Sequence, residues 1–347
     1  MQKTDNVERA HLLVEMARVA EQLEENGKAI SLFDDALAQF SEDSTDPFLP
    51  DVLRWKGTLL REKGDTEAAF RCYTMSLEKA RLIGSEKAEA HALNCLGTVA
   101  QRRCDLKECE RLYAQASILA SKAGDARLLG MIEQNRGVMA SMRGDFAQAA
   151  GFYSNSLGAF EMVGDTEPMS WVLNNLGILH TKIRNFEEAR GYLERGLAIA
   201  INRSDNVVEN VIRLNLAEVW FGLERFEQAD ECCVEALEQA QRRGDHLTAA
   251  GALKIRAAIE RQRGALDKSI ATLRIAIYEA EGAEDRLLHA EMLRELGEIS
   301  RAVGNAGAAR SAWREAVDSY KGIGAIQEVA EVQQRLHALP PGHTLRQ

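Results

Sequence analysis

The sequence feature that most constrains the fold is an internal repeat with a period of about 40 residues. Stepping from Gly177 by one period at a time in both directions gives a column that holds only Gly or Ala: Ala17, Gly57, Gly97, Gly137, Gly177, Ala217, Ala257 and Gly297. A second column of small residues lies twelve positions later: Ala29, Ala69, Cys109, Ala149, Ala189, Ala229, Ser269 and Ala309. A third follows after seven more: Ala36, Ser76, Ala116, Ser156, Gly196, Ala236, Ala276 and Ala316. Three columns in register indicate eight copies of one structural unit.

Each unit is predicted to be a pair of antiparallel helices. Two helices approach within about 8 to 10 Å only where the side chains at their crossing are short. Turn signals such as Gly144-Asp145 within a unit and Gly164-Asp165 between units recur at intervals of half a period, and Gly can end a helix where Asp caps the next one. Apolar residues between turns follow helical spacing, and no strand is expected. The fold class is therefore all-α.

The two ends of the array depart from the repeat. In repeat one the turn is predicted to lie later than in the other units, at Asn26-Gly27. The junction from Ser41 to Pro50 contains two prolines and is predicted to be the least regular. Residues 1–338 contain no long linker and are expected to form one solenoid, closed by a capping helix at about 325–338, with 339–347 as a flexible tail.

Composition narrows the classes of partner and compartment. Asp and Glu number 53 against 43 Lys and Arg, a net charge of -10, which argues against direct binding to nucleic acid or to anionic membranes. No apolar run approaches the roughly 20 residues that would cross a bilayer, and the N-terminal segment does not resemble a secretory signal. Six cysteines in a chain large enough to fold without disulfides fit a reducing cytoplasm.

The unit resembles the tetratricopeptide repeat. The resemblance rests on Gly144-Asp145-Phe146 at the turn, then Ala149, Tyr153 and Ser156-Leu157, and it extends over roughly residues 8 to 338. The 40-residue period is similar to the long variant found in kinesin light chains and in bacterial regulators with peptide-sensing repeat domains. The resemblance implies a right-handed superhelical solenoid of about eight hairpins, in which the first helix of each unit lines a concave groove. It implies a scaffold and no particular partner.

Asparagines are predicted to line that groove. A residue two places before the Gly column lies about 200 degrees round the helix and faces away from the partner helix. These residues are Asn135, Asn175 and Asn215, and the adjoining flank carries Asn94, Gln134 and Asn174. Amides can donate to and accept from a peptide backbone, and groove asparagines do so in the resembling proteins. The alternative is that they are solvated residues on an exposed helix stripe.

Basic residues add a second candidate feature near the C-terminal end. Lys254 and Arg261, like Arg294 and Arg301, are seven positions apart and share a helical face, as do Arg54 and Arg61 further upstream. At the C-terminal end they could bind acidic side chains or a terminal carboxylate of a peptide. The favoured alternative is that they form ion pairs with Glu260, Glu295 or Glu298.

The sequence contains no set of residues that indicates an enzyme, a cofactor or a metal site. It has no phosphate-binding Gly-rich loop with Lys, no His-Glu-x-x-His and no nucleophile elbow. Cys104 and Cys109 lack the further ligands that a metal site needs, and are interpreted as structural. His180, Trp55, Trp171, Trp220 and Trp313 are interpreted as core or groove-wall residues.

Two functions fit these observations. One is an adaptor that binds a protein or peptide segment in the groove; the other is a regulator whose superhelix changes conformation when a peptide binds. Repeat one begins near His11, which leaves no room before it for an effector module and favours the adaptor. A homodimer is also possible, because an exposed terminal repeat can stack on its twin.

Overall fold

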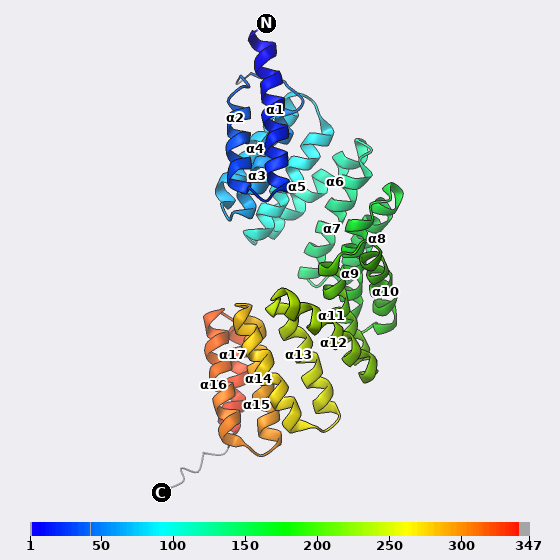
Figure 1. Cartoon of the computed structure of the whole chain (residues 1–347), viewed down its shortest axis with the longest axis vertical. Coiled ribbons are helices and arrows are strands. Elements are labelled where there is room, and N and C mark those ends of the chain that lie inside the picture. Colours follow the sequence, from blue (N-terminus) through cyan, green and yellow to red (C-terminus); the bar gives the residue numbers. More distant parts are fainter. Residues whose placement is uncertain (1, 42, 340–347) are drawn as a thin grey trace. The chain divides into compact units, whose positions relative to one another are not determined.

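The computed structural model describes residues 2–41 and 43–339, and these residues form seventeen α-helices and no strand (Figure 1). The helices are α1 (Gln2–Gln22), α2 (Asn26–Leu37), α3 (Leu49–Glu62), α4 (Thr66–Leu82), α5 (Glu86–Arg102), α6 (Leu106–Lys122), α7 (Ala126–Met142), α8 (Phe146–Val163), α9 (Thr166–Lys182), α10 (Phe186–Asn202), α11 (Asn206–Gly222), α12 (Phe226–Arg243), α13 (His246–Gln262), α14 (Leu266–Gly282), α15 (Arg286–Ala302), α16 (Ala306–Gly322) and α17 (Ile326–Ala338). Odd-numbered helices from α1 to α15 are the first helices of eight hairpins. The predicted all-α hairpin solenoid is confirmed.

The chain divides into two compact units, Met1–Val172 and Leu173–Gln347. Within each unit, buried apolar side chains of successive hairpins form a core between first and second helices. In the first unit one core cluster includes Phe33 and Leu59, and another includes Tyr113 and Ile132. In the second unit, one cluster is built around Trp313.

The first small-residue column marks the closest contact inside a hairpin. Each residue of this column faces the residue sixteen positions later on the second helix. A Cβ built on Gly297 would lie 2.2 Å from Nε1 of Trp313, and one on Gly97 would lie 2.5 Å from the Tyr113 ring. In one hairpin that has Ala217 in the first column, the residue sixteen positions later is Cys233, and both are buried. The small residues of the first column thus allow the two helices of a hairpin to approach closely, including where the facing residue is a large ring.

The turn between the first and second helix has the same conformation in all eight hairpins. The second residue after the first helix takes a positive φ, as at Gly144 (φ 79), and the Asp that follows caps the second helix in several units. Where Gly is absent, Cys104, Arg184 and Glu224 adopt the same left-handed conformation.

Repeat one follows this rule, and the prediction that its turn lies later is wrong. Glu24 has a φ of 60 and stands one full repeat before Gly64, while Asn26 and Gly27 already belong to α2. The contact of Ala17 with its own second helix fixes the register, so Glu24 is held in a left-handed conformation despite its side chain. That conformation costs about 1 kcal/mol or more for a residue with a Cβ.

The third small-residue column also carries hydrogen bonds between the two helices of a hairpin. The hydroxyl of Ser156 donates to the carbonyl oxygen of Gly130 at 2.7 Å, and Ser76 donates to Pro50 in the same way at 2.7 Å. Asn210 is the repeat equivalent of Pro50 and Gly130 in the hairpin of α11 and α12. Its side chain is 1% exposed, and neither amide atom has a hydrogen-bond partner among the described residues.

The C-terminal end is closed by α17, as expected. Val332 and Leu339 are buried in the cluster around Trp313, whereas Gln327, Glu331 and Gln334 are exposed. The expected flexible tail, 339–347, lies outside the described residues except for Leu339.

Replacing Gly297 with Ala should destabilise the protein by about 1 to 3 kcal/mol, because the new methyl group overlaps the Trp313 indole and the helices must separate. Unfolding in urea followed by circular dichroism measures this change. Gly191→Ala is the matched control, since Gly191 lies in α10 with open space around it and should gain about 0.5 to 1 kcal/mol. Equal stability of the two variants would contradict the packing argument.

Replacing Asn210 with Ala should stabilise the protein by about 1 kcal/mol, since a buried amide without partners costs about 1 to 3 kcal/mol and part of the gain is lost to the smaller volume. Asn174→Ala serves as the comparison. Asn174 is equally buried but accepts a hydrogen bond, so its loss should destabilise. A lower midpoint for Asn210→Ala in urea unfolding would refute this interpretation.

Candidate functional site

The predicted asparagines lie on the faces of first helices that neighbour one another within each unit. Asn94 is on α5 and Asn135 on α7, two helices in contact in the first unit. Asn174 is on α9 and Asn215 on α11 in the second unit. We call these surfaces the first-helix faces.

The asparagines form pairs that join one first helix to the next. Nδ2 of Asn135 donates to Oδ1 of Asn94 at 3.0 Å, and Nδ2 of Asn215 donates to Oδ1 of Asn174 at 2.7 Å. In both pairs the two residues are 41 positions apart in the sequence, so the same contact forms once in each of the two compact units. The repeat register places the residue two before the small column beside the residue three before it on the preceding first helix.

The two members of each pair differ in accessibility. Asn94 is 6% and Asn174 is 3% exposed, so neither presents a binding surface. Asn135 and Asn215 are partly exposed. An amide has two N–H donors and one carbonyl oxygen. Each outer asparagine therefore keeps an N–H and its oxygen beyond the bond that holds it in place. Gln134 and Asn175 are partly exposed as well.

The basic residues near the C-terminal end are mostly neutralised. Lys254 lies 2.5 Å from a carboxylate oxygen of Glu291, and Arg261 lies 2.6 Å from Glu295. Arg301 lies 3.3 Å from Glu298. Arg294 has no ion pair among the described residues. Arg261 and Arg301 therefore pair with carboxylates that the sequence predicts, whereas Lys254 pairs with one that it does not. The predicted role of Glu260 is wrong, because Glu260 pairs with Lys268 at 3.1 Å.

An aromatic side chain occupies the asparagine column in the first unit. Trp55 of α3 stands two full repeats before Asn135. The guanidinium groups of Arg18 and Arg54 lie 4.9 and 5.5 Å from its ring centroid, a cation–π arrangement. The column spacing places Trp55 on a first-helix face, in agreement with its interpretation as a groove-wall residue.

His91 of α5 lies one helical turn before Asn94. Burial, aided by the positive charge of Arg54 and opposed by Asp51 and Asp125, lowers its pKa from 6.5 to about 4. The imidazole is therefore uncharged at neutral pH.

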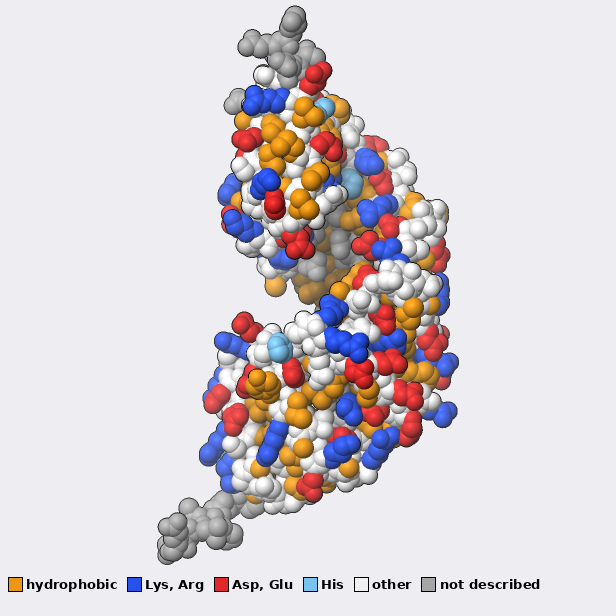
Figure 2. Space-filling view, in the orientation of Figure 1, with side chains coloured by type: hydrophobic (Ala, Val, Ile, Leu, Met, Phe, Trp, Pro, Cys, Tyr) orange, Lys and Arg blue, Asp and Glu red, His pale blue; other side chains and the backbone are white. Residues whose placement is uncertain are grey.

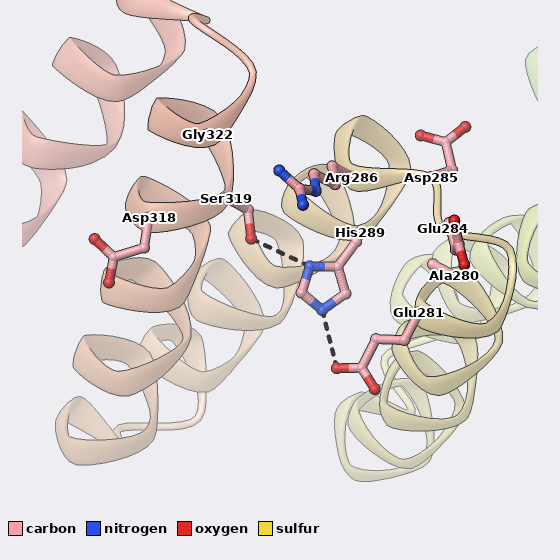
Figure 3. A pocket seen from close by; sticks show the side chains of 9 residues that line it. All are labelled: Ala280, Glu281, Glu284, Asp285, Arg286, His289, Asp318, Ser319 and Gly322. Carbon is pink, nitrogen blue, oxygen red and sulfur yellow. Dashed lines mark hydrogen bonds and ion pairs between the residues drawn. The ribbon is translucent and has the colours of Figure 1, made fainter.

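A cavity of about 670 Å³ lies at the junction between α14 and α15, against the end of α16 (Figure 3). His289 joins its two sides, with Nδ1 3.2 Å from the Ser319 hydroxyl and Nε2 3.3 Å from a Glu281 carboxylate oxygen. A smaller cavity recurs one repeat earlier around His246, whose Nδ1 lies 2.7 Å from Glu279. Because such a cavity recurs at equivalent junctions between hairpins, we interpret it as a product of the repeat geometry.

All six cysteines lie among the described residues. All six are free, and burial raises the pKa of the Cys109 thiol to about 11. Across residues 2–41 and 43–339, no group of His, Cys, Asp and Glu side chains is arranged to hold a metal ion. In the same residues no helix has the length and apolar character needed to cross a membrane.

The comparisons with known proteins agree on the fold. The tetratricopeptide repeat model matches residues 133–202. A comparison with curated proteins finds no match.

Several solved structures are similar to the chain. A Signal Transduction ATPase with Numerous Domains protein with a tetratricopeptide repeat sensor, from Pyrococcus horikoshii, has a TM-score of 0.68 at 14% identity; the match covers 94% of this chain and 47% of that one. A Rap protein complexed with Competence and Sporulation Factor has a TM-score of 0.60 at 14% identity, over 92% and 99% of the two chains. A tetratricopeptide repeat protein from Parabacteroides merdae has a TM-score of 0.59 at 18% identity, over 82% and 98%. The chain thus spans about half of the Pyrococcus protein, and at these identities the likeness is one of fold.

Lowering the pH should destabilise the protein through His91. Above about pH 6.5 the side chain is neutral in both the folded and the unfolded state; between about 6.5 and 4 only the unfolded state binds a proton, so stability falls by about 1 to 3 kcal/mol. Urea unfolding of the wild type and His91→Gln from pH 7.5 to 4 measures this. The variant should lose less stability over that range, whereas His337→Gln, an exposed position on α17, should follow the wild type. Parallel curves for wild type and His91→Gln would contradict the assignment.

Proposed function

We propose that this chain, an array of tetratricopeptide repeats, is a non-enzymatic scaffold or adaptor that holds a peptide or protein segment against its first-helix faces. The paired asparagines carry the proposal. In each pair the buried member accepts a hydrogen bond from the outer member and fixes its orientation. An amide that is already oriented loses little conformational entropy when it binds a ligand.

The chemistry of the outer amides suits an extended backbone. Each can donate one N–H to a peptide carbonyl and accept a peptide N–H, which grips the backbone with little demand on side chains. We assign direct contact to Asn135 in the first unit and to Asn175 and Asn215 in the second, with Gln134 beside Asn135. Asn94 and Asn174 act as supports. We expect no general preference for acidic ligands, because Lys254, Arg261 and Arg301 already pair with carboxylates.

A second candidate function is a regulator that responds to a peptide. It is favoured by likeness in fold to a Rap protein complexed with Competence and Sporulation Factor and to a protein with a tetratricopeptide repeat sensor. A change in the radius of gyration on peptide binding, measured by small-angle X-ray scattering, distinguishes this regulator from a rigid adaptor. For either function we assign a reducing cytoplasm, since all six cysteines are free.

Changing the outer asparagines should weaken peptide binding by about tenfold or more, because each lost hydrogen bond contributes about 0.5 to 1.5 kcal/mol. Peptides are selected from a phage-displayed random dodecapeptide library on the wild-type chain, synthesised, and titrated by calorimetry. The variants are Asn135→Ala for the first unit and Asn175→Ala with Asn215→Ala for the second, so the unit that binds is identified.

The matched controls are Asn155→Ala and Asn202→Ala, exposed asparagines on the second helices α8 and α10, which should bind as the wild type does. Unchanged affinity in all the first-helix variants would move the binding site elsewhere. Failure to select any peptide above background would count against a scaffold for linear segments.

A further inference from the structure

Another cavity lies within the second unit, at the edge where first helices turn into second helices. Its volume is about 700 Å³, and it is lined by the ends of α9, α11 and α13, the starts of α10 and α12, and the turns between them. We call this cavity, built around Phe186, Phe221 and Phe226, the turn-edge pocket. Neither asparagine of the pair on α9 and α11 lines it, so it is separate from that site.

Three partly exposed aromatic rings form the apolar part of the turn-edge pocket. The ring centroids of Phe221 and Phe226 are 5.7 Å apart. Phe186 reaches across from the preceding hairpin, since a Cβ built on Gly222 would lie 2.4 Å from its Cε1 atom. One repeat earlier the positions of Phe221 and Gly222 hold Thr181 and Lys182, and one repeat later they hold Arg261 and Gln262. The aromatic surface is therefore a feature of these two hairpins and not of the repeat in general.

Charged side chains of opposite sign come from the two hairpins that form the turn-edge pocket. Lys182 and Arg184 belong to the hairpin of α9 and α10, whereas Glu218 and Glu224 belong to the hairpin of α11 and α12. All four are exposed, and none of them has an ion pair among the described residues. Figure 2 shows acidic and basic side chains interspersed over the visible face of the second unit. Ion pairs form elsewhere in this unit, so these four charges stand out as available to a ligand.

Two of these charged residues occupy a backbone position that favours glycine. Arg184 and Glu224 are equivalent residues of successive turns, with φ values of 60 and 61, and four of the eight hairpins carry Gly at this position. A residue with a Cβ is disfavoured in this conformation, and strained residues are common at binding sites. The guanidinium group of Arg184 lies 5.6 Å from the ring centroid of Phe186, a cation–π contact that holds the positive charge beside the rings.

We propose that the turn-edge pocket binds a segment of another protein in which an aromatic side chain has an acidic residue on one side and a basic residue on the other. The aromatic side chain packs against the three phenylalanine rings. The acidic residue pairs with Lys182 or Arg184, and the basic residue pairs with Glu218 or Glu224. Because the charged rim is exposed, the pocket admits one side chain of a polypeptide, whereas a small-molecule site encloses most of its ligand. This proposal does not depend on the asparagine pairs.

Three short peptides test the charge pattern. The probe is the acetylated and amidated pentapeptide Asp-Asp-Phe-Lys-Lys with 4-fluorophenylalanine at its centre, titrated to about 5 mM and followed by fluorine NMR, which detects weak binding of the ring itself. The comparison peptides carry the same ring between four Asp or four Lys residues. The wild-type chain should bind the mixed peptide at least about fivefold more tightly than either, because each comparison peptide sets like charges against one wall of the pocket.

Variants of the pocket should change this preference while circular dichroism stays the same. Lys182→Glu with Arg184→Glu makes both walls acidic and should make the all-Lys peptide the tightest of the three. Lys63→Glu with Lys107→Glu, at exposed positions of the first unit, changes the net charge equally and should keep the wild-type order.

Phe221→Thr, which copies the preceding repeat, should weaken binding of the mixed peptide at least about fivefold, because one ring of the pocket is lost. The proposal is overturned if the wild type binds none of the peptides or binds all three equally. It is also overturned if the acidic pocket variant keeps the wild-type order, or if Phe221→Thr binds as the wild type does.

Discussion

The close contact between a small residue on each first helix and the residue sixteen positions later on its second helix is the constraint on which the structure depends. In four hairpins an aromatic ring, as at Tyr113, stands opposite Gly; in the first hairpin Phe33 stands opposite Ala17, and Cys233 stands opposite Ala217. This contact sets the helix spacing, and the spacing sets the register of the turns. Repeat one shows how strong the constraint is, since Glu24 accepts a left-handed conformation so that its turn stays in register. The asparagine pairs between neighbouring first helices form because that register recurs in every hairpin.

The fold could be predicted from the sequence because packing at small columns leaves a periodic mark. The number of hairpins, the turn positions of six of them and the capping helix follow from the columns and from turn signals such as Gly144-Asp145. The turn of repeat one could not be predicted locally. Asn26-Gly27 is a stronger turn signal than Glu24-Glu25, and only the tertiary contact of Ala17 decides between them.

The sequence predicts which helices carry the asparagines but not which of the asparagines are buried. The columns place Asn94, Asn135, Asn174 and Asn215 on first-helix faces, yet they do not indicate which members are buried. Whether an asparagine is buried depends on how far the neighbouring first helix covers it. This coverage is set when the hairpins pack together and cannot be read from one repeat alone. The ion pairs of Lys254 and Arg261 depend on the same packing, since their partners lie 37 and 34 residues away. Leu12 and Val19 of α1 are another such case: both are exposed, whereas the equivalent residues of the later first helices are buried.

The matching of small to large residues has a consequence for how such an array can change length. Both members of each matched pair lie within one repeat unit, as with Gly297 and Trp313. A duplicated stretch of coding sequence that spans a whole unit therefore carries its own complementary pair. The contacts between units use columns filled with interchangeable aliphatic residues. Genetic gain or loss of entire hairpins should be tolerated far better than a shift of a few positions, and the number of repeats can evolve separately from the packing of each one.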